Sequence, residues 1–369
     1  MSEWFEFYGF KRNPYERKEP MDIPFEFVKW NRDDLKDKWQ LDRFIEDVLK
    51  GRSVSLRVFG PSGAGKTWLL RYIEKRIKQE NKEALIFYTK LTRVEPTFEA
   101  FYRNFIENFK EHYLERFLNV VVNRAGLSIN KWEEYFEDPD LAKALYHIAH
   151  KDEHRLVSER WLLGENVSFS MLKSVEIVSS LSNYRKVEVL KSIIRKSVEI
   201  FPLCVLFVDE IGLVTPSVGR ALGGALKELL DEFYEKFSLV STYTATISDQ
   251  LIDRGYDLHF YRRFDYEVEL SPINRDYVAD FLRIHHTCYR KKEVEVSDEL
   301  LPFTEDSIKK LYDLIVPENC HPGSILKAAG NLAREASYMK IKQIDAAFVE
   351  KNANRIPREL LKSSAEILS

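Results

Sequence analysis

The chain has 369 residues, enough for two domains. Its 56 basic and 59 acidic residues leave a net charge of −3, which excludes a globally basic nucleic-acid-binding protein. Any contact with DNA or RNA must therefore come from a local basic patch. No apolar run approaches the length of a membrane span, and the charged, aromatic N-terminus lacks the apolar centre of a signal peptide, so we expect a cytoplasmic protein without membrane contact. The three scattered cysteines are typical of reduced thiols: Cys204, Cys288 and Cys320.

The start of the chain is predicted to form an arm followed by a helix. Residues 1–30 are rich in aromatic side chains and are interrupted by Pro14, Pro20 and Pro24, so we expect an irregular arm packed on the body. The stretch 31–51 has its apolar residues at helical spacing and ends in a glycine, which predicts an amphipathic helix.

A glycine-rich turn, GPSGAGKT, follows at residues 60–67. An alternating apolar stretch typical of a strand precedes it, and the helical pattern WLLRYIEKRIKQ follows it. The phosphate-binding pattern GxxxxGK[ST] requires this context, so we expect ATP to be bound by backbone N–H groups and the Lys66 ammonium, with Thr67 on Mg²⁺. The residues predicted to hold the nucleotide are Gly60, Pro61, Ser62, Gly63, Ala64, Gly65, Lys66, Thr67 and Trp68.

The chain between this turn and the next motif is predicted to be mostly helical. Residues 83–91 give a second strand, and residues 95–118 give one long helix whose aromatic stripe we assign to the core. Residues 119–199 show consecutive amphipathic helices and no strand candidate, so we expect a helical insertion in the nucleotide core. The aromatic stripe consists of Phe98, Phe101, Phe105, Phe109, Tyr113 and Phe117.

The apolar run FPLCVLFVDEIG places two carboxylates at the end of a strand. A continuous apolar strand is typical of the centre of a parallel sheet. In phosphoryl transfer such carboxylates orient Mg²⁺ and polarise the attacking water, so we assign the metal to Asp209 and the general base to Glu210. The alternative is a solvated strand end without chemistry.

The remaining chain predicts two more strands and a helical end. Residues 216–237 are predicted to form a helix and residues 238–248 a strand. Residues 252–273 cross a loop to a last strand, and only helical patterns follow Pro272. We therefore predict an α/β protein: a three-layer P-loop parallel sheet with a large helical insertion and a C-terminal all-α lid. The predicted divisions are the arm at 1–30, a nucleotide-binding core at 31–271 and the lid at 272–369.

The motifs GPSGAGKT and LFVDE resemble those of the AAA+ superfamily of oligomeric ATPases. The resemblance is to the branch around the origin-recognition initiators of archaea and eukaryotes, the transposition-associated ATPases and the STAND signalling ATPases. It implies ATP hydrolysis in a homo-oligomer, with Thr246, or Ser248 as the fallback, sensing the γ-phosphate. It also implies that Arg263 or Arg262 serves as an arginine finger toward the neighbouring subunit, the alternative being a surface pair beside a strand.

The sequence departs from the AAA+ pattern in the lid. In HPGSILKAAGNLAREA, Ser324 falls near the position of the second sensor arginine, and Lys327 or Arg334 would replace that arginine only if the turn shifts. This departure favours a slow, switch-like ATPase. The final stretch, RIPRELLKSSAEILS, is expected to be too short for the winged-helix module that initiators usually append.

Three further patterns bear on role. The stretch EFYGFKRNPYERKEP resembles the lead-in of secretion-associated and transposition-associated ATPases, and ERWLLGENVSFSML resembles an element of phage-defence and related archaeal ATPases. His147, His150 and His154 lie on one side of two helical turns, a spacing that zinc accepts, although surface histidines in a charged helix are commoner.

Two functions stay open at this point. The first is an ATP-driven, DNA-associated machine of replication, transposition or genome-defence type, whose local basic patch would contain Lys90, Arg93 and Arg220. A solvated helix face explains the same charges. The second is a STAND-like switch or scaffold that assembles with protein partners through the insertion, without nucleic acid. A small-molecule kinase would need an acceptor site that no motif provides.

Overall fold

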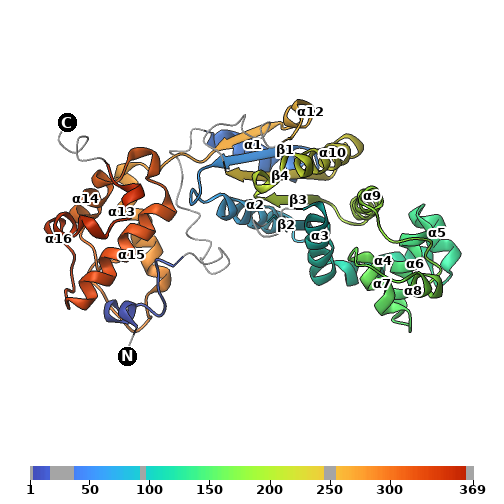
Figure 1. The fold of residues 1–369 in the computed structure, drawn as a ribbon, viewed down its shortest axis with the longest axis horizontal. Coiled ribbons are helices and arrows are strands. Elements are labelled where there is room, and N and C mark those ends of the chain that lie inside the picture. The colour runs from blue at the N-terminus through green and yellow to red at the C-terminus, as the bar shows by residue number, and fades with distance from the viewer. Residues whose placement is uncertain (1–2, 17–36, 92–96, 245–254, 363–369) are drawn as a thin grey trace. The chain divides into compact units, whose positions relative to one another are not determined.

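The computed structural model describes residues 3–16, 37–91, 97–244 and 255–362. Its centre is a five-stranded sheet in the order β2-β3-β4-β1-β5. The predicted α/β class, with a parallel sheet, a helical insertion and a helical C-terminal region, is confirmed (Figure 1). The strands are β1 (Ser55–Gly60), β2 (Leu85–Lys90), β3 (Cys204–Asp209), β4 (Phe237–Thr244) and β5 (Tyr266–Glu269).

Strand β3 lies inside the sheet and is buried at every position. It pairs in parallel with β2 on one side and β4 on the other, so the carboxyl ends of these three strands lie along one edge. Burial on both faces requires apolar side chains throughout the strand, which is the pattern that its sequence shows.

Helices connect the strands and form the rest of the molecule. Helix α1 (Lys38–Leu49) precedes β1, α2 (Lys66–Glu80) connects β1 to β2, and α10 (Pro216–Glu232) connects β3 to β4. Between β2 and β3 lie α3 (Phe98–His112), α4 (Leu114–Ala125), α5 (Ile129–Phe136), α6 (Pro139–His150), α7 (Arg155–Leu162), α8 (Phe169–Ser174) and α9 (Asn183–Ile200). The short α12 (Leu258–Tyr261) precedes β5, and α13 (Val278–Tyr289), α14 (Glu305–Leu314), α15 (Pro322–Tyr338) and α16 (Ala346–Lys351) follow it.

The prediction of one helix over residues 95–118 was wrong, because the chain breaks between α3 and α4. At the break, Tyr113 has φ −135° and ψ −22°, outside the helical region. Its hydroxyl accepts a hydrogen bond from the Ile86 N–H at 3.3 Å, which joins the turn to β2. The aromatic stripe continues across the break because both helices face the same core, so its periodicity does not reveal the turn.

The stripe is core, as predicted. Phe105, Phe109 and Phe117 are fully buried, and the ring centroids of Phe87 on β2 and Phe105 lie 4.3 Å apart. Figure 1 shows α3 leading away from the sheet, α4 to α8 gathered beyond it, and α9 returning toward β3. The insertion and the sheet therefore share one continuous apolar core.

The chain divides into two compact units, which we describe separately. One contains residues 39–59 and 73–268, with most of the sheet and the whole insertion. The other contains residues 1–38, 60–72 and 269–369, with the glycine-rich turn and the C-terminal helices. Among the described residues, no helix combines the length and apolar character that crossing a membrane requires.

The described part of the N-terminal arm packs on the C-terminal helices. The Tyr8 hydroxyl donates to the Ala333 carbonyl oxygen at 3.1 Å, and the Tyr15 hydroxyl lies 2.9 Å from His286 Nε2. A Cβ added to Gly330 on α15 would lie 2.6 Å from the Cβ of Tyr15. Glycine at this position therefore permits the close approach of the arm to the helix.

Candidate nucleotide site

The glycine-rich turn adopts backbone conformations that favour glycine. Gly60, Gly63 and Gly65 have φ values of +157°, +86° and +98°. A Cβ on Gly60 would lie 3.0 Å from the Leu270 carbonyl oxygen, whereas a Cβ on Gly65 would meet no heavy atom within 4 Å. The turn is thus close-packed at its start and open beside Gly65, which fits a bound phosphate group.

The lysine of the turn folds back over it. Lys66 is the first residue of α2 and is 4% exposed. Its Nζ donates to the carbonyl oxygens of Gly60 at 2.9 Å and Pro61 at 3.0 Å. These contacts hold a full positive charge at the N-terminus of a 15-residue helix, whose partial positive charge adds to it.

Asp209 is the last residue of β3 and is fully buried. One carboxylate oxygen accepts a hydrogen bond from the Thr242 hydroxyl, and the other accepts one from the Tyr88 hydroxyl at 2.8 Å. These two hydrogen bonds orient the carboxylate. An oxygen donor of this kind suits Mg²⁺.

The carboxylate of Glu210 is oriented by the neighbouring strand β4. Glu210 has φ +63°, a strained value for a residue with a side chain, and its N–H donates to the Thr242 hydroxyl at 2.9 Å. The Thr244 hydroxyl donates to Glu210 Oε2 at 3.1 Å. Thr242 and Thr244 thus position both carboxylates, a role that sequence reasoning missed although the alternating threonines of STYTAT mark the strand end.

Several predicted residues lie outside the described part of the chain. These are Thr246 and Ser248, the sensor candidates, and Arg93 of the basic patch. Of the remaining patch residues, Lys90 ends β2 and is half-buried, and Arg220 is exposed on α10.

The two candidate finger arginines differ in their contacts. Both follow α12 and are exposed. Arg263 forms an ion pair with Asp231 on α10, with 2.6 Å between Nη2 and Oδ1. Arg262 forms no ion pair with any described residue, so its guanidinium is the less constrained of the two.

Helix α15 touches the glycine-rich turn at its first residues. The Gly323 N–H donates to the Gly63 carbonyl oxygen at 3.0 Å. This hydrogen bond therefore joins the turn directly to one of the C-terminal helices.

None of the three second-sensor candidates on α15 has the setting of a free cation near its start. Ser324 is a buried neutral side chain, 8% exposed. Lys327 Nζ is paired with Glu359 at 2.8 Å. Arg334 is exposed and lies three turns into the helix.

The histidines of the insertion make local hydrogen bonds. His147 Nδ1 lies 2.7 Å from Asp152 Oδ2, and His150 Nδ1 lies 2.8 Å from the Tyr146 carbonyl oxygen. In the described ranges no group of three His, Cys, Asp or Glu side chains has a metal-binding arrangement. The element ERWLLGEN is also engaged in packing, since Trp161 Nε1 donates to the Ser179 carbonyl oxygen at 2.9 Å.

Together, the sheet order β2-β3-β4-β1-β5, a glycine-rich turn after β1 and carboxylates after β3 define the fold of the AAA+ ATPases. Among solved structures, the chain is similar in fold to Cdc6p from Pyrobaculum aerophilum and to the ORC2 protein of Aeropyrum pernix. No protein-family model matches the chain, and no curated protein matches it in sequence.

The structural matches extend over almost the whole chain at low identity. Cdc6p from Pyrobaculum aerophilum is 14% identical with a TM-score of 0.54, over 96% of this chain and 73% of that one. The ORC2 protein of Aeropyrum pernix, solved as ADPNP–ADP complexes, is 10% identical with a TM-score of 0.55, over 95% and 73%. The ADP form of the same protein is 11% identical with a TM-score of 0.52, over 94% of this chain and 73% of that one. At these identities the likeness establishes the fold.

Proposed function

We propose that this chain is a Mg²⁺-dependent ATPase that acts in an oligomer on DNA. The observation that carries the proposal is a hydrogen-bonded group at the carboxyl ends of two adjacent strands. Thr242 and Thr244 on β4 orient the carboxylates of Asp209 and Glu210 at the end of β3. Thr242 is fully buried, and its hydroxyl bonds both to Asp209 and to the Glu210 N–H, an arrangement that a solvated strand end would not need. The nucleotides in the Aeropyrum pernix ORC2 structures support ATP as the ligand of the shared fold.

In this proposal the glycine-rich turn binds the phosphates. The backbone N–H groups after Gly63 and the N-terminus of α2 attract the phosphate oxygens, and Lys66 exchanges its carbonyl partners for them. We base the assignment of Mg²⁺ to Thr67 and to Asp209 on their sequence motifs. When bound, Mg²⁺ supplies positive charge to the β- and γ-phosphate oxygens.

Glu210 acts as the general base in the proposed reaction. Its carboxylate accepts from Thr244, which leaves a second oxygen to polarise a water for attack. Thr246 senses the γ-phosphate. Arg262, whose guanidinium has no ion pair among the described residues, is the preferred finger toward a neighbouring subunit, with Arg263 as the alternative.

The experiment compares ATP binding and turnover in three proteins. Lys66→Ala is expected to lose ATP binding, whereas Glu210→Gln keeps ATP binding and loses turnover by roughly 10²–10⁴-fold. Glu153→Gln, a charge change at an exposed side chain of the insertion, is the control and is expected to behave as wild type. Normal turnover by Glu210→Gln would overturn the assignment of the base.

The DNA arm of the proposal needs its own measurement. Turnover and molar mass by light scattering are measured with and without double-stranded DNA at two salt concentrations. The proposal expects DNA to stimulate turnover and promote assembly, both weakened by salt, and Arg220→Ala to reduce the stimulation. Turnover and mass that are indifferent to DNA would refute the DNA role while leaving the ATPase assignment intact.

A second candidate, a nucleotide switch that assembles with protein partners, is favoured by one feature of the insertion. Large apolar side chains are exposed there, and Leu156, Phe169 and Tyr184 are each more than 70% exposed. Contiguous exposed apolar patches mark protein-binding surfaces, so these three side chains are the ones to substitute in testing this candidate. This candidate expects slow hydrolysis that nucleic acid does not change.

A further inference from the structure

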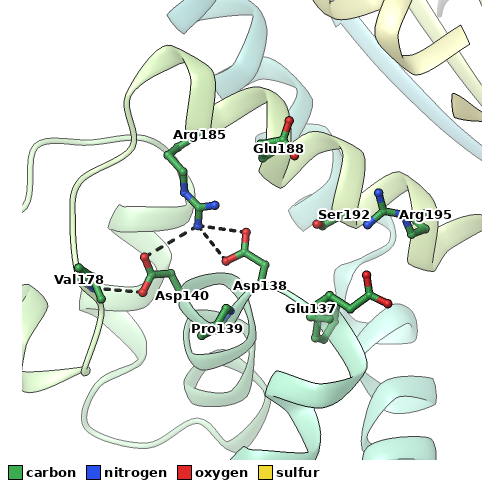
Figure 2. Close-up of a pocket in the computed structure, with 10 residues that line it drawn as sticks. Glu137, Asp138, Pro139, Asp140, Val178, Arg185, Glu188, Ser192 and Arg195 are labelled. Carbon is green, nitrogen blue, oxygen red and sulfur yellow. Dashed lines mark hydrogen bonds and ion pairs between the residues drawn. The ribbon is translucent and has the colours of Figure 1, made fainter. Parts of the chain in front are cut away.

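A pocket of about 420 Å³ lies inside the insertion, where the turn between α5 and α6 faces α9 (Figure 2). Its volume falls in the range of small-ligand and side-chain pockets. All of its lining residues belong to the unit that contains the sheet, and none takes part in the nucleotide site. It is lined by Phe136, Glu137, Asp138, Pro139, Asp140, Val178, Arg185, Glu188, Ser192 and Arg195.

The pocket has a surplus of negative charge. Four carboxylates line it against two guanidinium groups. Both guanidinium groups already bind carboxylates: Arg185 Nη2 lies 2.8 and 3.1 Å from the two oxygens of Asp138, and Arg195 Nε lies 3.1 Å from Glu232, outside the lining. An anion would therefore have to displace existing ion pairs. Among the carboxylates, Asp138 and Asp140 are paired with Arg185, and Glu188 lies 3.3 Å from Lys191 Nζ, so Glu137 is the lining carboxylate that a cation finds without an ion pair among the described residues.

Two residues that line the pocket, Glu137 and Ser192, have unused hydrogen-bonding capacity. Figure 2 shows Arg185 with Asp138 at one end and Glu137 with Ser192 at the other. The Glu137 carboxylate forms no ion pair or hydrogen bond with the described residues. Ser192 is only 7% exposed, and its hydroxyl also makes no hydrogen bond in that part of the chain. A hydroxyl that lines the pocket and has no partner in the protein can donate to or accept from a ligand that enters it.

The surroundings of the pocket favour a side chain on a polypeptide over a free ion. Val178 at the rim is 76% exposed, and Tyr184, which precedes the lining residue Arg185, is 73% exposed. An arginine has an apolar stem that packs on such groups and a planar head with five donors that matches carboxylates. No described cluster has a metal-binding arrangement, which disfavours a metal ion.

We propose that this pocket binds an arginine side chain, flanked by apolar residues, of a partner protein. Glu137 and Glu188 accept from the guanidinium, and Ser192 accepts from one of its N–H groups. The exposed Val178 and Tyr184 contact the flanking apolar residues. Nothing in this assignment depends on ATP hydrolysis, because the lining residues are separate from the nucleotide-binding ones.

The test uses full-length protein and a fluorescein-labelled peptide, Gly-Leu-Arg-Leu-Gly, with Gly-Leu-Gln-Leu-Gly as the reference probe. Affinity is measured by fluorescence anisotropy at two salt concentrations. The arginine peptide is expected to bind at least about fivefold tighter than the glutamine peptide, with the difference shrinking as salt screens the charges. Equal affinities for the two peptides, or displacement of the peptide by inorganic phosphate, would overturn the proposal.

Matched variants locate the peptide. Glu137→Gln and Ser192→Ala are each expected to weaken binding of the arginine peptide, Glu137→Gln by about fivefold. Glu134→Gln makes the same charge change on α5 at an exposed residue outside the pocket and is expected to leave binding unchanged. If Glu134→Gln weakens binding as much as Glu137→Gln, the attraction is a general surface effect and the site assignment is wrong. Thermal unfolding of each variant verifies that it is folded.

Discussion

Replacing Thr242 with valine removes one hydroxyl and tests whether that hydroxyl organises both carboxylates. Thr242 is fully buried, and its hydroxyl donates to Asp209 and accepts from the Glu210 N–H at 2.9 Å. Valine has nearly the same shape, so the core loses no volume. The change leaves the Asp209 carboxylate with one of its two hydroxyl donors, Tyr88, and leaves the Glu210 N–H without its partner.

The expected loss follows from those two contacts. A hydrogen bond to a charged group contributes about 1.5–3 kcal/mol, and an unsatisfied buried N–H costs about 1–3 kcal/mol, so we expect a loss of roughly 2–5 kcal/mol in unfolding free energy. In a domain of this size each kcal/mol corresponds to about 2–4 °C in Tm. The assay is calorimetric unfolding, combined with ATP turnover, which should fall more than ATP affinity does.

A neighbouring residue supplies the control. Ser241 is also fully buried on β4, but its hydroxyl has no hydrogen-bond partner in the described ranges. Ser241→Ala should therefore change stability by less than about 1 kcal/mol. Thr242→Ser, which keeps the hydroxyl, should retain turnover. If Thr242→Val melts within about 2 °C of Ser241→Ala, the hydroxyl does not organise the carboxylates and the reasoning fails.

Three further predictions concern the arm and the finger. Gly330→Ala should destabilise the C-terminal helices by about 1–3 kcal/mol in unfolding measurements, because the added Cβ clashes with Tyr15. The control is Gly224→Ala on α10, which has open space around it and should be neutral or stabilising. Equal effects of the two substitutions would contradict the close approach of Tyr15 to Gly330. Burial lowers the pKa of His285 from 6.5 to about 4, so the unfolded chain binds the proton more readily than the folded chain does. Up to about 3 kcal/mol of stability that is present above pH 6.5 should therefore be lost as the pH falls toward 4. The measurement is the protection of residues 3–16 against hydrogen exchange, and protection that stays constant over that pH range would contradict the prediction. Arg262→Ala should reduce concentration-dependent ATP turnover more than the same change at the adjacent arginine, which has its own ion pair, and the reverse order would exchange the two assignments.

The features that sequence predicted well are those encoded by near neighbours. The glycine-rich turn carries its conformations in its own residues, since Gly60, Gly63 and Gly65 have φ values that favour glycine. The position of Asp209 at the end of a buried strand was predicted because the apolar run before it marks that strand, whereas its role toward Mg²⁺ stays a prediction.

The features that sequence missed depend on contacts between distant residues. Thr242 meets Asp209 only because β4 pairs with β3, and that pairing is not visible in either strand alone. At the break between α3 and α4, the Tyr113 hydroxyl accepts a hydrogen bond from Ile86 on β2, and Ile86 is not part of the helical pattern that predicted one helix. Likewise, no local signal reveals that Tyr15 packs against Gly330.

The docking of the arm on the C-terminal helices also sets an order of events during synthesis. The Tyr8 hydroxyl bonds to a carbonyl 325 residues later in the chain. At about 5–20 residues per second, a ribosome needs roughly 15–65 s to make that partner after the arm emerges. Through this interval the aromatic side chains of the arm are without their final packing, so binding by a chaperone at residues 3–16 would protect nascent chains that have not yet reached α15.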